Sequence, residues 1–226
     1  MKDDGSSDFE LKRILGSIAI PFLFISICFA LRLLESMNLF SFVELGIYPR
    51  HINGLQGVIL APLIHADWAH FGANSVSFFI LASMLFYFYQ GVALKAFIHI
   101  YLFSGLFVWI LGRESWHVGA SGLIYGFGSF LFFSGLIRNH IPLMAISLFV
   151  IFMYGSMVWG MFPLKVNLPY SWEAHMGGVF FGLFFAILYR NHGPQQPVKI
   201  WHDEDDDPSL PNQDDAPHEE AQDRLK

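Results

Sequence analysis

Long apolar runs alternate with short polar segments along most of the chain, and these runs predict membrane-spanning helices. A helix of about 20 apolar residues crosses the hydrocarbon core of a bilayer. Six segments approach this length: residues 14–34, 70–89, 92–111, 120–137, 141–162 and 174–189. The first run is too long for a cleaved signal peptide, and no small-residue cleavage site follows it. The pattern predicts an all-α membrane protein, a polytopic bundle of six transmembrane helices.

The connections between the predicted helices differ in length. The connections at residues 90–91 and 138–140 are so short that the helices they join are predicted to form antiparallel hairpins. Residues 35–69 form a long first loop that contains Pro49 and Pro62. This loop is too interrupted to span a bilayer and too apolar for an ordinary solvent-exposed connection. We expect a structured first loop that lies partly in the membrane interface.

Composition supports the membrane assignment, and charge divides the chain into three parts. The chain is 54% apolar and 14% charged, against roughly 25% charged in an average soluble domain. A water-soluble enzyme, a disordered regulator and a nucleic-acid binder are therefore poor fits. Residues 191–226 hold ten acids and three bases, a net charge of −7, whereas residues 14–190 hold five acids and seven bases, a net charge of +2. We expect an N-terminal segment over 1–13, a helical domain over 14–190 and an acidic, disordered tail over 191–226.

Basic residues in the short loops predict the orientation in the membrane. The side that holds both termini would receive six of them: Lys12, Arg13, Lys95, Arg138, Arg190 and Lys199. The opposite side would receive Arg50, Arg113 and Lys165, with Arg32 at a helix end. Because Lys and Arg favour the cytoplasmic side, both termini are expected to be cytoplasmic.

Three polar clusters open the second, fourth and sixth predicted helices. Their sequences are HADWAHFGAN at residues 65–74, GASG at 119–122 and AHMGG at 174–178. With six alternating spans, the even-numbered helices all begin on one face, so the clusters reach a similar depth on the non-cytoplasmic side. Polar residues inside spans usually face the bundle interior or a water-filled cavity. The clusters therefore predict one shared site.

Ser121 and His175 are the candidate nucleophile and general base of this site. None of the five acids between residues 14 and 190 lies inside a predicted helix. Glu173 is two residues before His175 and would point away from it on a helix. The pattern therefore favours a Ser-His dyad over a triad. Small residues, among them Gly119 and Gly122, would let the two helices approach closely.

Other polar groups near Ser121 could stabilise a developing oxyanion. A residue at a helix start has backbone N–H groups without intrahelical partners, so the Ser121 amide is available. His70 and Asn74 are four residues apart on one helix face, and both can donate a hydrogen bond to the same oxyanion. Tyr125 is four residues after Ser121 and could pack on His175.

Together these residues resemble the rhomboid family of intramembrane serine proteases. The resemblance covers residues 14–190, and the segment GIYPR at 46–50 also resembles the first loop of bacterial members. It implies that Ser121 is the nucleophile and His175 the general base. It implies an oxyanion hole of His70, Asn74 and the Ser121 backbone amide. It also implies that Tyr125 holds the His175 ring and that His65 is a structural hydrogen-bonding residue in a water-filled cavity.

The resemblance further implies a six-helix core, no metal and no cofactor, and the composition argues against a nucleic-acid partner. The expected partners are the lipid bilayer and transmembrane protein substrates, cleaved at a small residue. The expected location is the bacterial inner membrane. The acidic tail and the lack of a soluble domain before the first span depart from the family pattern and leave regulation open.

Three alternatives stay open from the residues alone. His65 and His70 could ligate a metal, although they are five residues apart and no His-Glu-x-x-His motif occurs. A non-catalytic relative could bind membrane helices with the same fold. A transporter could use six helices and a polar cavity, but an inverted repeat is not visible.

Overall fold

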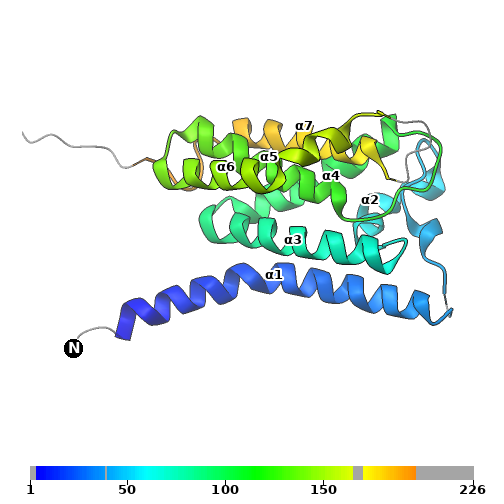
Figure 1. The fold of residues 1–226 in the computed structure, drawn as a ribbon, viewed down its shortest axis with the longest axis horizontal. Coiled ribbons are helices and arrows are strands. Elements are labelled where there is room, and N and C mark those ends of the chain that lie inside the picture. Colours follow the sequence, from blue (N-terminus) through cyan, green and yellow to red (C-terminus); the bar gives the residue numbers. More distant parts are fainter. Residues whose placement is uncertain (1–3, 39, 165–169, 197–226) are drawn as a thin grey trace, which may run out of the picture. The chain divides into compact units, whose positions relative to one another are not determined.

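The computed structural model describes residues 4–38, 40–164 and 170–196 as a bundle of helices, with no strand in these ranges (Figure 1). The elements in chain order are α1 (Asp4–Ser36), η1 (Val43–Leu45), η2 (Ile52–Gly54), α2 (Gly57–Leu60), η3 (Ala61–Leu63), α3 (Trp68–Phe88), α4 (Ala93–Leu111), α5 (Ser121–Arg138), α6 (Ile141–Tyr154), η4 (Gly155–Met161) and α7 (Trp172–Leu188). The predicted all-helical fold is confirmed. The part of the predicted acidic tail from residue 197 onward lies outside the described residues.

Helices correspond to all six predicted spans. Five stretches are long and apolar enough to cross a membrane: Ser7–Ser36, Trp68–Phe88, Ala93–Leu111, Ser121–Arg138 and Ile141–Met161. The apolar helix α7 has 17 residues, at the lower end of the length of about 17–25 residues that a span needs. Large apolar side chains such as Phe22 and Phe152 are exposed on the outside of the bundle. Lipid is the solvent that such a surface requires.

Helix α5, which begins with Ser121, is the centre of the bundle. Eleven of its 18 residues are buried, and it contacts α3, α4, α6 and α7 (Figure 1). A helix that is apolar on all sides is typical of such a central position. The candidate nucleophile is therefore carried by the best-enclosed helix of the fold.

Glycines bring α7 against α5. A Cβ atom added at Gly178 would collide with the carbonyl oxygen of Gly122, and one added at Gly182 would collide with that of Gly126. Small residues permit this backbone approach in membrane helices. The close approach that small residues were expected to permit is observed, and it brings the first turns of the two helices together.

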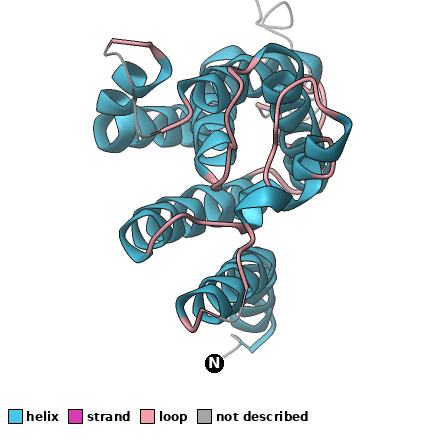
Figure 2. Ribbon diagram, turned by 90° about the vertical axis from the view of Figure 1, so that its right-hand side faces the viewer, coloured by secondary structure: helices cyan, strands magenta, loops and turns pink. Residues whose placement is uncertain are grey.

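Helix α1 lies at the edge of the bundle and packs along α3 (Figures 1 and 2). The Phe24 and Phe78 rings stack with their centroids 4.3 Å apart. The helix begins at Asp4, ten residues before the predicted span. The apolar run marks where a helix can lie in lipid, but the helix continues beyond it because its polar side chains find partners. Arg13 donates to the carbonyl oxygen of Tyr87 at 3.1 Å, and the Tyr87 hydroxyl donates to Glu10 at 3.1 Å.

The first loop is structured, as expected, and contains η1, η2, α2 and η3. It is tied to the segment before α5, since Ile47 and His117 exchange two backbone hydrogen bonds of 3.0 and 2.8 Å. The Gly119 amide donates to the carbonyl oxygen of Ala61 at 2.9 Å. The loop thereby supports the chain that leads to Ser121.

The predicted fifth span, 141–162, is not one regular helix. Its α-helical part ends at Tyr154, and residues Gly155–Met161 continue as the 3-10 helix η4. Gly155 and Gly160 have low helix propensity, and the tighter coil directs backbone carbonyl groups toward α5 and α7. Two short connections are as predicted: residues 89–92 join α3 to α4, and residues 139–140 join α5 to α6.

Candidate active site

Ser121 and His175 lie side by side at the starts of α5 and α7. The distance from Ser121 Oγ to His175 Nε2 is 2.9 Å. Ser121 is the first residue of its helix, and Gly119 precedes it with a φ of 109°. That backbone conformation is accessible to glycine and strained for other residues. Gly119 thus permits the turn that leads the chain into α5.

The partner of the other ring nitrogen defines which tautomer His175 adopts. His175 Nδ1 lies 2.8 Å from the carbonyl oxygen of Gly160 in η4. Because a carbonyl oxygen only accepts hydrogen bonds, Nδ1 carries the proton in the neutral ring. Nε2 then has a free lone pair directed at the Ser121 hydroxyl. This is the protonation state that a general base needs.

Aromatic rings hold His175 in place. The Tyr125 ring stacks on it with a centroid distance of 4.1 Å and an interplanar angle of 8°. Tyr170 also stacks on it, with a centroid distance of 5.5 Å. The Tyr125 hydroxyl donates to the carbonyl oxygen of Met157 at 2.7 Å. Both the orientation and the tautomer of the imidazole are therefore defined before any substrate arrives.

Glu173 is not a partner of His175. Its buried carboxylate accepts hydrogen bonds from the backbone N–H and the guanidinium of Arg113, at 3.2 and 3.3 Å. The two ring nitrogens of His175 bond Ser121 and Gly160, so neither is left for a carboxylate. The arrangement is a pair of side chains oriented by a backbone carbonyl.

His70 and Asn74 converge on Gly119, two residues before Ser121. A Cβ atom at Gly119 would lie 2.6 Å from His70 Cε1 and 3.3 Å from Asn74 Nδ2. Asn74 is buried, and its Nδ2 has no hydrogen-bond partner within residues 4–38, 40–164 and 170–196. A buried donor without a partner is costly, so its presence in a fold calls for an explanation such as a role in catalysis. Asn74 can therefore donate to a negative charge that develops next to Ser121.

Asp67 orients the start of α3, which carries these two side chains. Its Oδ1 accepts the backbone N–H of His70 at 2.7 Å, the bond of an N-terminal helix cap. That hydrogen bond holds the pKa of the Asp67 carboxyl below its usual range. Capping keeps the first turn of α3, and with it His70, at the site.

His65 is buried beside His70, and the ring centroids lie 5.2 Å apart. Burial lowers the pKa of His65 to about 4, so the ring is neutral at pH 7. Its two nitrogens have no hydrogen-bond partner among the described residues. The hydrogen-bonding role predicted for His65 therefore finds no protein partner there and stays a prediction. The described ranges hold no group of three His, Cys, Asp or Glu side chains arranged to bind a metal ion.

Sequence reasoning missed the carbonyl groups of Gly160 and Met157 and the ring of Tyr170. A backbone carbonyl has no sequence signature, because every residue carries one. The available signal was Gly160 itself, since a Cβ atom there would collide with the Tyr125 hydroxyl. A glycine late in an apolar span marks a place where backbone approaches another group closely.

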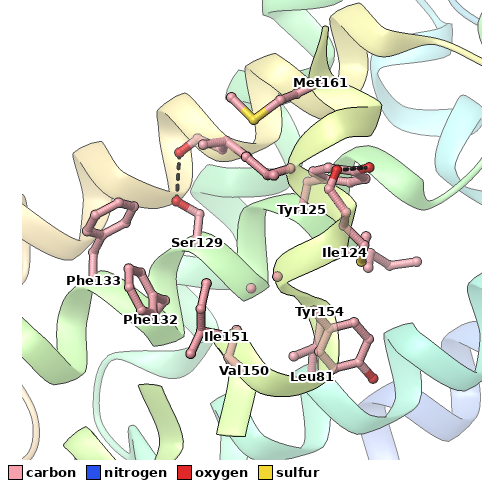
Figure 3. Close-up of a pocket in the computed structure, with 15 residues that line it drawn as sticks. Leu81, Ile124, Tyr125, Ser129, Phe132, Phe133, Val150, Ile151, Tyr154 and Met161 are labelled. Carbon is pink, nitrogen blue, oxygen red and sulfur yellow. Dashed lines mark hydrogen bonds between the residues drawn. The ribbon is translucent and has the colours of Figure 1, made fainter. Parts of the chain in front are cut away.

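An apolar cavity of about 320 Å³ lies beside Tyr125, between α5, α6, η4 and α7 (Figure 3). Its walls include Ile124, Val150 and Met161. The Ser129 hydroxyl on its wall donates to the carbonyl oxygen of Val179 at 2.8 Å, as the dashed line in Figure 3 shows. Most of the lining is aliphatic or aromatic, so the cavity suits an apolar group.

Comparison with known proteins identifies similar chains. The family model for the Rhomboid domain matches residues 53–192. Uncharacterized protein Rv1337 of Mycobacterium tuberculosis (strain ATCC 25618 / H37Rv) is 31% identical over 172 residues, which cover 73% of this chain and 72% of that protein. Uncharacterized protein ML1171 of Mycobacterium leprae (strain TN) is 27% identical over 199 residues, which cover 83% and 76%. The match to the Rhomboid family model includes α3 to α7 and therefore every helix of the candidate site.

Proposed function

Because the chain belongs to the rhomboid family of intramembrane serine proteases, we propose that it cleaves single-pass membrane proteins in or beside their transmembrane helix with a Ser121–His175 dyad. The observation that carries the proposal is the 2.9 Å contact between Ser121 Oγ and His175 Nε2, with Nδ1 occupied by Gly160. A serine hydroxyl is a weak nucleophile, and an adjacent base that accepts its proton activates it.

The proposed reaction has two stages. In the first, Ser121 Oγ attacks the carbonyl carbon of the scissile bond while its proton moves to His175 Nε2. The resulting imidazolium is stabilised by the Gly160 carbonyl and the Tyr125 ring, and it then protonates the leaving amine. In the second stage, water attacks the ester on Ser121 while His175 accepts a proton from it. The bond between Ser121 Oγ and the acyl carbon then breaks, His175 returns the proton to Ser121 Oγ, and the acid product is released.

The negative charge on the tetrahedral intermediate needs hydrogen-bond donors. The backbone N–H of Ser121 belongs to the first turn of α5 and has no intrahelical acceptor. The side chains of His70 and Asn74 are the other proposed donors, and Asn74 Nδ2 has no other partner among the described residues. Such preorganised donors often supply the largest contribution to catalysis.

The proposed substrates follow from the chemistry of a helix in lipid. A helical peptide bond is shielded by its own hydrogen bonds, so the substrate must unwind locally, and glycine, proline or small polar residues favour this. The scissile bond is proposed to lie at a small residue. The cavity beside Tyr125 suits an apolar side chain of the same segment.

The Lys and Arg distribution supports cytoplasmic termini and a site that opens toward the non-cytoplasmic face. The protein is an integral, multi-pass membrane protein, and the proposed location is a bacterial inner membrane. Residues 14–190 would form the protease domain.

The experiment that tests the proposal is cleavage of a single-pass model substrate in liposomes. The purified full-length chain should cleave it, and Ser121→Ala should not. Ser134→Ala is the matched control, because Ser134 is a buried serine on the same helix, far from the site, and it should retain cleavage. An inactive wild-type chain would instead favour a non-catalytic member of the family.

A further inference from the structure

A second cluster of polar side chains joins the two segments that lead into α5 and α7. On the α5 side it contains Arg113 and His117, and His117 lies four residues before Ser121. On the α7 side it contains Ser171 and Glu173, two residues before His175. His117 and Glu173 are buried. None of these four side chains has a part in the proposed reaction.

The centre of this cluster is the contact between His117 and Ser171. His117 Nε2 lies 2.9 Å from the carbonyl oxygen of Arg113, so Nε2 donates and carries the proton. Nδ1 then accepts the hydrogen of the Ser171 hydroxyl at 2.7 Å. Burial lowers the pKa of His117, in keeping with a neutral ring. The Ser171 oxygen also accepts the backbone N–H of Ala174 at 3.2 Å and so caps α7.

A second connection runs beside it through Glu173. The side chain of Glu173 is 3% exposed and pairs with the Arg113 guanidinium at 3.3 Å. The same guanidinium donates to the carbonyl oxygen of Tyr170 at 2.9 Å. A buried carboxylate is stable only when its charge is paired and hydrogen-bonded. Arg113 therefore bridges the segments before α5 and α7 at two points.

These hydrogen bonds can fix the position of α5 along α7, which glycine packing alone does not define. Glycines bring α5 and α7 close together, but a glycine has no side chain that could interlock with the facing helix and fix its axial position. The 2.9 Å distance between Ser121 and His175 depends on that axial register. The reaction rate depends steeply on the distance between reacting groups, since a 1 Å misplacement can lower it about 10²-fold.

We infer that His117, Ser171, Glu173 and Arg113 are positioning residues that set the register of the Ser121 helix against the His175 helix. The inference rests on the proposed function, because it assigns these side chains to the same dyad. They act through the two helix starts and do not touch the reacting atoms.

A kinetic test uses the Ser171 hydroxyl in the full-length chain. Ser171→Ala removes the bond to His117 and should lower kcat by about 10- to 100-fold with KM unchanged. Ser171→Thr keeps a hydroxyl and should restore most of kcat. Ser147→Ala is the matched control, since Ser147 is a buried serine of α6 whose hydroxyl donates to the Phe132 carbonyl at 2.7 Å. It should retain the wild-type kcat. A rise in KM at unchanged kcat, or equal losses in Ser171→Ala and Ser147→Ala, would overturn the inference.

A second test measures register without any need for activity. A Cβ atom at Gly122 would lie 3.4 Å from Ala174 Cβ, close to the separation of about 3.5–4.5 Å in a disulfide. Gly122→Cys with Ala174→Cys, in a Cys28→Ser background, should therefore cross-link on oxidation. Adding Ser171→Ala should slow the cross-linking several-fold, and adding Ser147→Ala should not. An unchanged rate with Ser171→Ala would defeat the inference whether or not the chain is a protease. Failure of the wild type to cleave any substrate would defeat only the proposed function.

Discussion

His175 carries its proton on Nδ1 because that nitrogen faces the carbonyl oxygen of Gly160 at 2.8 Å. In the familiar catalytic triad a buried carboxylate has this task and also stabilises the imidazolium. A neutral carbonyl provides less stabilisation, so ring stacking on Tyr125 is expected to matter more here. Two predictions follow for single residues around Ser121: one concerns the ring that holds the base, and the other concerns the donors of the proposed oxyanion hole.

The first prediction concerns the base. Tyr125→Phe keeps the ring on His175 and loses only the bond to Met157, so kcat should fall modestly. Tyr125→Ala removes the stacked ring and should lower kcat far more, because the imidazole is then free to rotate away from Ser121. Steady-state kinetics on a single-pass model substrate measure both. Equal activity of the two variants would show that stacking has no part in holding the base.

The second prediction concerns the proposed oxyanion hole. Asn74→Ala and His70→Ala should each lower kcat by up to about 10²–10³, the usual effect of losing one donor. Asn74→Asp is nearly isosteric and replaces the donor by a negative charge, so it should be at least as damaging as Asn74→Ala. If all three variants turn over like the wild type, these side chains do not bind the oxyanion.

Sequence patterns indicated most of the side chains that meet at the site, but missed the Tyr170 ring and the backbone carbonyl groups that bond His175 and Tyr125. Ser121, His175, His70 and Asn74 stand out because polar residues are rare in apolar spans. Gly160 stands out only as a glycine, and its carbonyl oxygen is invisible in a sequence. The carbonyl reaches His175 because the chain changes from α-helix to the 3-10 helix η4, and residue patterns do not report that change.

Helix α7 approaches α5 closely enough that a side chain has no room at Gly178. A Cβ atom there would overlap the carbonyl oxygen of Gly122. Backbone cannot move aside as a flexible side chain can, so even a methyl group must push the helices apart. The contact between the two helices thereby sets how closely the helix of the nucleophile approaches the helix of the base.

The third prediction compares two glycines in helices. Gly178→Ala should lower both the midpoint of thermal unfolding in detergent and the cleavage rate. Gly16→Ala in α1 is the matched control, because no atom lies within 4 Å of its added Cβ. It should be neutral or stabilising, since alanine favours a helix over glycine by about 1 kcal/mol. A Gly178→Ala protein as stable and active as Gly16→Ala would contradict the close packing.

Apolar runs predicted the existence of these helices well and their ends poorly. The apolar run in α1 begins at residue 14, yet the helix begins at Asp4 because Glu10 and Arg13 find partners around Tyr87. The run from 141 to 162 is continuous, yet α6 ends at Tyr154. Helix ends depend on local hydrogen-bond partners that come from elsewhere in the fold.

The whole molecule divides by composition into an apolar bundle and an acidic tail. The tail predicted for residues 191–226 lies mostly outside the described residues, which end at 196. It holds ten acids and three bases, a net charge of −7, and few apolar residues, so we expect it not to pack on a bundle in lipid. Basic residues in the loops predict that it is cytoplasmic.

The fourth prediction follows from that topology. Deleting residues 200–226 should leave the cleavage rate in detergent unchanged, because the proposed dyad faces the opposite side of the membrane. An effect on abundance or location in cells is compatible with this expectation. A truncated protein that is folded and monodisperse yet cleaves many-fold more slowly would contradict it.

The central claim is that His175 activates Ser121 as a nucleophile, and covalent labelling measures this most directly. The purified full-length chain would be incubated with a fluorophosphonate, which reacts with activated serines, and the modified residue mapped by mass spectrometry. The account predicts labelling at Ser121 and a loss of several orders of magnitude in labelling rate for His175→Asn, since nucleophile and base act as a unit. Labelling at another serine, no labelling of the wild type, or an unchanged rate in His175→Asn would contradict it.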